Sequence, residues 1–367
     1  MTTFLWMFIG AYDSLRVYII NNNSISSFIQ MEYSAYEEAT VPICSFVLKN
    51  GMQTEKMIAL RLSKFKGVME VQKQKVLEGL KDANCKYIYS ANPSDFEKIQ
   101  GSPIAYWASK EYLDVCESGV TVSSLASPKT GMTTGDNNRF LRLWGEVSNE
   151  TLMLNATSKE EAKNSGAKWF PYLKGGDFRR WYGNNEYVVN WYNDGHEIKN
   201  NIKPNGAKAA SVRSEQLYFK PLISWSAVSS STFACRYNKG GSLFDSGGSS
   251  LYIEDNRFYV LALLNSKVGQ YALNLTNPTI NYQPGDIAGI PLRIDEVQQI
   301  EEITCACVEL SKEDWDSFEN SWDFTCHPLM KKLDSGKGCA TLISDMYNSW
   351  ESECNSRFEQ LQKKEEE

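Results

Sequence analysis

The sequence predicts an α/β segment, then a larger α+β region, then a helical C-terminal segment. Three observations indicate this order. Short apolar runs rich in β-formers surround an amphipathic stretch within residues 3–48. Short β-like runs separated by glycine and asparagine fill residues 165–290, and residues 293–367 are polar with a helical pattern. We expect four parts: 1–50, 51–125, 126–292 and 293–367.

The first part is expected to contain a β-α-β unit followed by another strand. Residues 3–10, 25–33 and 41–48 are the predicted strands, and residues 12–23 are a predicted helix that ends in a run of asparagines. This pattern amounts to about half of a doubly wound sheet. We therefore expect the chain to begin midway through such a sheet.

The remaining elements follow the same periodicities. Residues 53–83 predict one strand and one helix, and residues 104–118 predict a second helix. Further along we expect a loop at 127–139, β-like runs at 187–191, 217–225 and 249–253, a helix at 258–273 and an ordered loop at 277–287.

Composition sets broad limits. The chain has 367 residues, of which 42% are hydrophobic and 23% charged, as in ordinary globular proteins. No uninterrupted apolar run approaches the roughly 18 residues of a membrane span, and the apolar start lacks the basic residues of a signal peptide. Nine scattered cysteines without a CxxC pair, and only two histidines, do not form a zinc motif. We expect reduced thiols, a cytoplasmic location and no membrane partner.

Charge is distributed unevenly along the chain. The net charge is −7, which by itself argues against a nucleic-acid binder. Residues 165–240, however, carry eleven Lys/Arg against five Asp/Glu, whereas residues 293–367 carry eight against eighteen. A basic middle beside an acidic tail fits one DNA-facing region and one solvated or partner-facing region.

The most informative stretch is residues 168–184, which we call the basic-aromatic segment. It holds four cations, six aromatic residues and three glycines. Cations bind phosphates, flat rings stack on bases, and glycines allow a close backbone approach. The functional hypothesis is phosphate contact by Lys168, Lys174, Arg179 and Arg180, with Trp181 and Tyr182 packed beneath them or touching bases. The structural alternative is a core hinge whose charges point to solvent.

The other motifs have plain structural interpretations. A turn is sufficient to explain the motif Thr134-Gly135-Asp136-Asn137. The nearby Arg139 and Arg142 slightly favour a functional role for it. A hairpin entry is the favoured interpretation of Asn281-Tyr282 and Gly285-Asp286. His196 is expected at the surface after a turn, and His327 has no sequence partner. No Gly-x-Ser-x-Gly, Walker loop or HExxH motif occurs, so no catalytic set can be assembled.

The order of these motifs resembles a known family. Residues 127–144, 168–184, 264–268 and 277–287 together closely resemble the PglX family, the adenine-specific DNA methyltransferases of BREX phage-defence systems, which are akin to type IIG restriction-modification enzymes. Residues 311–327 and 357–361 look like the C-terminal part of that family. The resemblance runs over nearly the whole chain, and its motifs are specific only when taken together in order.

The resemblance implies methyl transfer from S-adenosylmethionine to adenine N6 within a specific, non-palindromic DNA site. Residues 1–50 would then be the last strands of the methyltransferase core, a remnant of its doubly wound sheet, and residues 126–292 the target recognition domain. The family's Asn-Pro-Pro-Tyr motif and glycine-rich cofactor loop are absent from this sequence, and Asn92-Pro93-Ser94 lacks the following aromatic residue. We therefore expect a C-terminal portion of the family, truncated or encoded by a split gene, with no catalytic residues. S-adenosylmethionine would serve the full-length enzyme, and this chain alone is not expected to bind it.

Within this hypothesis Lys168, Lys174, Arg179, Arg180, Arg213 and Lys220 neutralise phosphates. Residues among 184–193 and 224–236 read base edges. The complete expected DNA-binding set is Arg139, Arg142, Lys168, Lys174, Arg179, Arg180, Trp181, Tyr182, Arg213, Lys220 and Arg236.

Double-stranded DNA is the expected partner, and an upstream methyltransferase half or other BREX proteins are further candidates. Two alternatives stay open at this point. One is a stand-alone DNA-binding specificity or decoy protein without catalytic activity. The other is a carbohydrate-binding module, which only the richness in Trp and Tyr suggests.

Overall fold

The structure, a computed structural model, describes residues 1–33, 35, 41–277, 279–334 and 342–367. It divides into two compact units. Unit 1 comprises Met1–Thr121, Tyr271–Pro278 and Pro291–Arg293, and unit 2 comprises Val122–Gln270, Thr279–Ile290 and Ile294–Glu367. None of the described helices is both long and apolar enough to cross a membrane.

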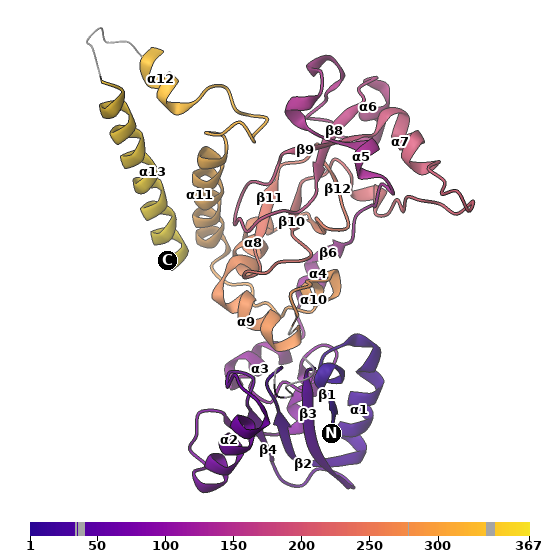
Figure 1. The fold of residues 1–367 in the computed structure, drawn as a ribbon, viewed down its shortest axis with the longest axis vertical. Coiled ribbons are helices and arrows are strands. Elements are labelled where there is room, and N and C mark those ends of the chain that lie inside the picture. Colours follow the sequence, from indigo (N-terminus) through magenta and orange to yellow (C-terminus); the bar gives the residue numbers. More distant parts are fainter. Residues whose placement is uncertain (34, 36–40, 278, 335–341) are drawn as a thin grey trace. The chain divides into compact units, whose positions relative to one another are not determined.

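Unit 1 is built on one mixed sheet with the strand order β1-β3-β2-β4-β5. Strands β2 and β4 pair in parallel, and the other neighbours pair antiparallel. Its elements, in indigo to purple in Figure 1, are β1 (Thr2–Thr3), η1 (Phe4–Met7), η2 (Gly10–Tyr12), α1 (Asp13–Asn22), β2 (Asn23–Gln30), β3 (Ile43–Asn50), β4 (Met57–Arg61), α2 (Met69–Lys81), β5 (Ile88–Ala91), η3 (Pro93–Lys98) and α3 (Lys110–Glu117).

Most of the elements predicted for unit 1 are confirmed. The predicted helix at 12–23 is α1, and the predicted strands at 25–33 and 41–48 are β2 and β3. The prediction of one strand and one helix in residues 53–83 is also correct, whereas the helix predicted at 104–118 is limited to the shorter α3.

The predicted strand at residues 3–10 is wrong. Phe4–Met7 form a 3-10 helix that buries Phe4, Trp6 and Met7. A short apolar run fits a buried strand or a buried helical turn equally well, so periodicity could not separate them. The sheet is mixed rather than uniformly parallel, because only β2 and β4 pair in parallel among its described strands.

Unit 2 contains two four-stranded sheets, with the orders β11-β10-β13-β6 and β12-β8-β9-β7. Its elements are α4 (Val122–Leu125), β6 (Ala126–Lys129), α5 (Asn137–Phe140), β7 (Leu141–Leu143), η4 (Trp144–Glu146), η5 (Asn149–Thr151), α6 (Lys159–Asn164), β8 (Trp169–Leu173), β9 (Tyr187–Asn190), α7 (Tyr192–Lys199), η6 (Glu215–Leu217), β10 (Leu222–Trp225), β11 (Cys235–Asn238), β12 (Leu243–Phe244), β13 (Ser250–Ile253), α8 (Arg257–Asn265), α10 (Pro284–Ala288), α11 (Val297–Trp315), α12 (Pro328–Asp334) and α13 (Ile343–Glu366). Helix α9 (Lys267–Thr276) spans the boundary between the units. The helical C-terminal segment is thus confirmed, and the protein is a mixed α/β protein with small sheets.

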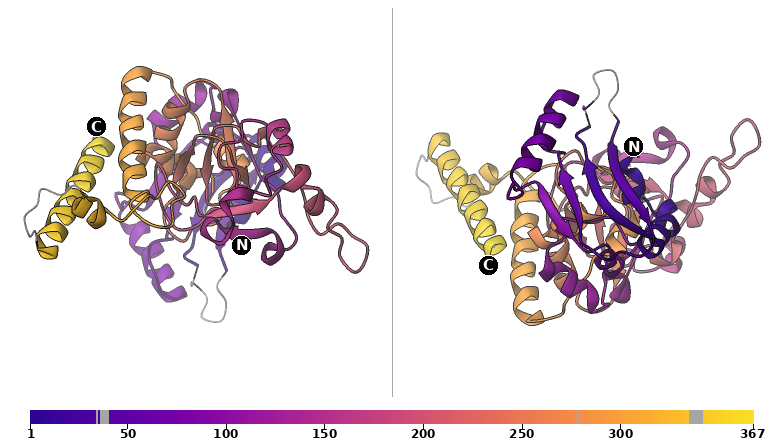
Figure 2. Two further views of the ribbon diagram at one scale, coloured as in Figure 1. Left: turned by 90° about the horizontal axis from the view of Figure 1, so that it is seen from above. Right: turned by 90° about the horizontal axis from the view of Figure 1, so that it is seen from below.

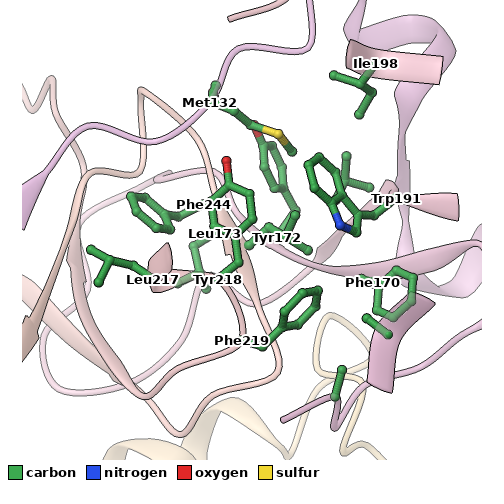
Figure 3. Packing of buried hydrophobic residues seen from close by; sticks show 14 of the residues in the cluster. Met132, Phe170, Tyr172, Leu173, Trp191, Ile198, Leu217, Tyr218, Phe219 and Phe244 are labelled. Carbon is green, nitrogen blue, oxygen red and sulfur yellow. Dashed lines mark hydrogen bonds between the residues drawn. The ribbon is translucent and has the colours of Figure 1, made fainter. Parts of the chain in front are cut away.

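The main core of unit 2 is organised around β8, and Figure 3 shows its aromatic side chains. Phe170 meets Phe219 edge-on with ring centroids 5.7 Å apart. Tyr218 lies edge-on to both Trp191 and Phe244, at 5.4 Å and 5.7 Å. Such edge-to-face pairs add to the stabilisation that burial of the rings already gives. Residues far apart in sequence are thereby fixed around one strand.

Local hydrogen bonding divides some of the predicted elements. The helix predicted at 258–273 is two helices, because the Ser266 hydroxyl donates to the Leu263 carbonyl at 2.7 Å and accepts from the Gly269 amide at 3.0 Å. Ser266 therefore ends α8 and caps α9. The loops predicted at 127–139 and 277–287 contain short elements.

Helix α5 lies within the loop predicted at 127–139, and Asp136 caps it by accepting a hydrogen bond from the Arg139 backbone amide at 3.1 Å. The hairpin entry favoured for Gly285-Asp286 is wrong, since both residues lie in α10. Pro284 occupies the start of α10, where its missing N–H is not needed.

Close backbone packing in unit 2 predicts a large effect of one added methyl group. A Cβ on Gly131 would lie 2.0 Å from the Phe244 carbonyl oxygen, and the Met132 amide donates to that same oxygen at 3.0 Å. We expect Gly131→Ala to lower the free energy of unfolding by about 2 kcal/mol or more, measured by urea denaturation.

The matched control is Gly145→Ala, because nothing lies within 4 Å of a Cβ at that position. Its stability should stay within about 0.5 kcal/mol of wild type. Equal stabilities of the two variants would show that the approach of Gly131 to Phe244 is not tight in solution.

Candidate nucleic-acid interface

Most aromatic rings of the basic-aromatic segment face the interior. All five residues of β8 are buried, and Trp181 and Tyr182 are 6% and 5% exposed. Phe178, at 46% exposed, is the segment's one ring on the surface. In this conformation Trp181 and Tyr182 pack inside unit 2, so base stacking by either ring would require the segment to open.

The backbone explains how Trp181 is turned inward. Trp181 has a φ of 69°, a left-handed conformation that is uncommon for a bulky residue. Its amide donates to the Cys235 carbonyl at 2.9 Å, and its carbonyl accepts from the Tyr237 amide at 2.7 Å. Two hydrogen bonds to β11 thus hold a strained residue in place.

Three of the segment's four cations form ion pairs. The Lys174 ammonium lies 3.1 Å from Asp245, a residue whose other oxygen is bonded by the Gly247 amide. Arg179 pairs with Asp314 at 3.4 Å, and Arg180 pairs with Glu365 at 3.0 Å. Among described carboxylates Lys168 has no partner, and it lies exposed 5.4 Å from the Trp169 ring.

The acidic C-terminal helices cover the end of this segment. The Trp181 indole N–H donates to the Glu365 carboxylate at 2.7 Å, and the Arg179 guanidinium lies 4.7 Å from the Trp315 ring. Lys312 lies 5.4 Å from the Tyr182 ring. Burial raises the pKa of Tyr182 to about 12, so this phenol stays neutral at physiological pH. Sequence analysis recorded both the basic and the acidic region but did not anticipate their contact.

The Arg236 side chain is buried rather than exposed at the surface. Its side chain is 3% exposed, and it donates to the Arg179 carbonyl at 3.4 Å and to the Ser226 hydroxyl at 3.3 Å. Burial lowers the pKa of Arg236 to about 10, which still leaves it charged near neutral pH. A direct phosphate contact by Arg236 would need the cover formed by residues 179–181 to move.

Among the other expected cations, Arg139, Arg213 and Lys220 are exposed and Arg142 is half-buried. Lys220 lies 4.6 Å from the Tyr252 ring, and the Arg213 guanidinium donates to the Ser211 hydroxyl. Arg142 donates to two backbone carbonyls and lies 5.8 Å from the Trp169 ring, the ring that Lys168 also contacts. Arg139 instead pairs with Glu197 at 2.9 Å. Together with Lys168, the residues Arg142, Arg213 and Lys220 lack a carboxylate partner in the part of the chain that the structure describes.

Two motifs that are distant in sequence meet at one cavity. A cavity of about 280 Å³ is lined by polar residues: Thr133, Thr134, Gly135, Asp136, Asn137, Lys174, Asp245 and Ser246. The Thr134 hydroxyl donates to the Asn137 side chain at 2.7 Å. The motif at residues 134–137 therefore forms an ordered loop beside the Lys174–Asp245 pair, which sequence analysis did not predict.

The two histidines have ordinary surroundings. His196 is exposed on α7, as expected. The His327 ring packs edge-on against Trp350 at 5.0 Å, and its Nδ1 accepts from the Leu329 amide. Neither arrangement adds a catalytic group to the candidate interface.

Sequence analysis missed Lys203 and Lys208. Both are exposed, and neither forms an ion pair with any described residue. One sequence feature could have indicated them: the turn sequence Pro204-Asn205-Gly206 lies between the two lysines. The surrounding stretch from 198 to 214 has no acidic residue.

The chain is homologous to part of two adenine-specific methyltransferases. It is 36% identical over 375 residues to PglX of Lacticaseibacillus casei (strain Zhang), a match that covers 100% of this chain and 31% of that protein. It is 32% identical over 341 residues to BrxX of Escherichia coli O9:H4 (strain HS), covering 89% of this chain and 26% of that protein. The chain thus spans a third or less of the length of these relatives. No family model matches it.

Three restriction-modification enzymes of known structure show a limited likeness. The Type IIL enzyme MmeI, solved in complex with DNA, aligns with a TM-score of 0.46 and 13% identity over 96% of this chain and 48% of its own. The type IIG endonuclease BpuSI aligns with a TM-score of 0.29 and 10% identity over 98% and 47%. The Type ISP enzyme LlaGI, in complex with a DNA substrate mimic, aligns with a TM-score of 0.37 and 10% identity over 83% and 34%.

The contact of α13 with the basic-aromatic segment predicts a local effect of Glu365→Gln. This change weakens the ion pair with Arg180 and the charged hydrogen bond from Trp181. Since both partners of the ion pair are about a third exposed, we expect a loss of no more than about 1 kcal/mol. Amide exchange in residues 343–366 and tryptic cleavage after Lys363 should become faster.

Glu359→Gln is the matched control, because it removes the same charge from an exposed position on α13 without a partner among the described residues. Its exchange and cleavage rates should equal those of wild type. Identical rates in the two variants would mean that Glu365 does not hold α13 in place.

Proposed function

We propose that this chain is the DNA-recognising, C-terminal part of an adenine-specific DNA methyltransferase that serves in a BREX-type phage-defence system. The observation that carries the proposal is the 36% identity with PglX along the whole chain, although the chain covers only 31% of that protein. The remainder of such an enzyme would carry out methyl transfer. This chain would position the DNA.

The two units would contribute differently. Residues 126–292, most of them in unit 2, would form the target recognition domain. Residues 1–50 would border the methyltransferase core, and the parallel pairing of β2 with β4 is the feature of unit 1 that fits a doubly wound sheet. The antiparallel neighbours of this pair would then belong to the edge of that sheet.

The cations of the candidate interface fall into two classes. Arg142, Lys168, Arg213 and Lys220, which lack a carboxylate partner in the described chain, would bind phosphates directly. Arg139, Arg179 and Arg180 would first have to exchange a carboxylate for a phosphate. Exposed ion pairs stabilise a protein by about 0–1 kcal/mol, so breaking the exposed pairs to bind phosphate would cost little free energy. The pair of Lys174 with the buried Asp245 would persist.

S-adenosylmethionine is the methyl donor that the homology implies for the whole enzyme. The residues of this chain do not fit it: the glycines of residues 1–121 stand singly, so they form no glycine-rich loop after a strand. Asn92-Pro93 leads into η3 without a following aromatic residue. We therefore assign no step of methyl transfer to this chain. Purified alone and given labelled cofactor and duplex DNA, it should transfer no methyl group.

DNA binding by the unpaired cations can be measured directly. We expect the chain to bind random-sequence duplex in fluorescence anisotropy, with affinity falling steeply between about 50 and 200 mM salt. Lys168→Ala and Lys220→Ala should each reduce the slope of log K against log salt by about one. Arg179→Ala and Arg180→Ala should reduce it less, since their own carboxylate partners compete with phosphate.

The control is Lys49→Ala, an exposed lysine at the end of β3 outside the proposed recognition domain. Its salt slope should equal that of wild type. A wild-type chain that fails to bind any duplex under low salt would overturn the proposed function. Equal slopes in all five variants would remove the assignment of these cations.

A further inference from the structure

Residues 200–210 project from the body of unit 2 as a narrow finger after α7, as Figures 1 and 2 show from three directions. The finger is a minimal two-stranded ribbon. Ile202 pairs antiparallel with Lys208, and the Lys203 amide donates to the Ala207 carbonyl at 2.8 Å. None of its residues is buried, so it contributes nothing to a core.

The tip of the finger is a closed turn. The Gly206 amide donates to the Lys203 carbonyl at 2.9 Å, and Gly206 has a φ of 79° that favours glycine. The Asn205 side-chain oxygen accepts from the Ala207 amide at 3.1 Å. The Asn205 side-chain nitrogen has no acceptor among the described residues, so it remains as a donor at the exposed tip.

The stem that enters the finger is fixed by charged hydrogen bonds. The Lys199 ammonium donates to Asp194 at 2.7 Å and to Glu215 at 2.8 Å. Lys159 on α6 donates to the same Glu215 at 2.6 Å. Burial alone would raise the pKa of Glu215, but the hydrogen bonds from Lys159 and Lys199 outweigh it and lower that pKa. The network keeps this stem charged and ordered.

The stem that leaves the finger is fixed by the loop of residues 133–137. Thr133 and Ser211 exchange two backbone hydrogen bonds of 2.9 Å and 3.0 Å. A Cβ on Gly135 would lie 2.5 Å from the Ala209 carbonyl carbon, so only glycine allows this approach. The Asn201 side-chain Nδ2 donates to the Thr134 carbonyl at 3.3 Å. The motif at 134–137 therefore supports the finger.

The charge of the finger is uncompensated. Lys203 and Lys208 are exposed without an ion pair to any described residue, and no acidic residue occurs between 198 and 214. Ile202 is also 62% exposed. A narrow finger with two lysines that have no ion-pair partner, an exposed side-chain amide and an apolar side chain matches a groove with anionic walls and base edges at its floor.

We propose that this finger enters the major groove of duplex DNA, an inference that rests on the proposed function. The major groove is about 12 Å wide and admits a two-stranded ribbon. Lys203 and Lys208 bind phosphates on the groove walls. The Asn205 amide donates to a base acceptor on the groove floor, and Ile202 offers apolar contact to a thymine methyl group. None of these four residues belonged to the DNA-binding set expected from the sequence.

The first test compares two double variants of the full chain on random-sequence duplex. Lys203→Ala/Lys208→Ala should reduce the slope of log K against log salt by about two. Lys163→Ala/Lys267→Ala removes two exposed lysines from α6 and α9 and should keep the wild-type slope. Equal slopes in both double variants and wild type would overturn the role of the finger while leaving the proposed function intact. Absence of binding by the wild-type chain would overturn both.

A variant with a shortened finger distinguishes the loss of DNA contact from a loss of folding. Replacement of residues 202–208 by two glycines is sterically feasible, because the Ala209 amide already donates to the Asn201 carbonyl at 2.8 Å. Urea denaturation should give wild-type stability, whereas affinity for duplex at about 100 mM salt should fall at least tenfold. Unchanged affinity would overturn the proposal.

Asn205→Ala tests base reading. After selection of duplexes from a randomised library by the wild-type chain, the variant should lose discrimination at one base position by about tenfold. It should keep the salt slope of wild type, since no phosphate contact is removed. Retained discrimination at every selected position would overturn the base-reading role of the tip.

Discussion

Burial of β8 is the constraint on which the rest of unit 2 depends. All five residues of the strand are buried: β9 and β12 pair along its two edges, and the side chains of Trp191, Tyr218 and Phe219 pack with those of the strand (Figure 3). The Tyr172 hydroxyl then needs a partner inside the core and donates to Asp245 at 2.8 Å. Burial also raises the pKa of Tyr172 well above its ordinary value. Asp245 in turn holds Lys174, the residue next to the strand. The position of a cation at the candidate interface thus follows from a hydrophobic strand.

Opposite charges within one chain explain how a protein of net charge −7 can still present cations without carboxylate partners, as the proposed DNA binding requires. The acidic helices α11 and α13 neutralise Arg179 and Arg180 locally, and other cations stay without carboxylates in the described structure. The interaction of exposed charges fades beyond about 10 Å at moderate salt. The acidic helices therefore lower the net charge of the chain, while Lys168 and Lys220 keep no carboxylate partner among the described residues. They would also compete with DNA at part of the basic-aromatic segment, because a phosphate would have to displace Asp314 to bind Arg179 or Glu365 to bind Arg180.

The sequence predicted regular elements better than surfaces. Strands β2 and β3 and helix α1 have clear periodicity and clear ends, and all three were found. The strand predicted over Phe4–Met7 was wrong because four apolar residues fit a strand or a 3-10 helix equally well. The break between α8 and α9 at Ser266 depends on a side-chain hydrogen bond that periodicity does not reveal. Composition singled out residues 168–184 but could not show that Trp181 points inward, which depends on two backbone bonds to β11. Lys203 and Lys208 were not predicted as DNA-binding residues, because in the sequence each is an ordinary surface lysine and only the folded ribbon brings them together.

The separation between scaffold and finger has a consequence for recognition. Every residue of 200–210 lies outside the core, while its supports at Gly135, Lys199 and Glu215 bind the body of unit 2. Substitutions at the tip therefore leave the buried contacts of β8 unchanged, and most surface substitutions shift stability by about 0.5 kcal/mol or less. Substitutions at the supports would instead misplace the whole finger. If the finger contacts bases as proposed, substitutions at its tip can change which bases it contacts without affecting the fold, provided that residue 135 stays glycine for the close approach to Ala209.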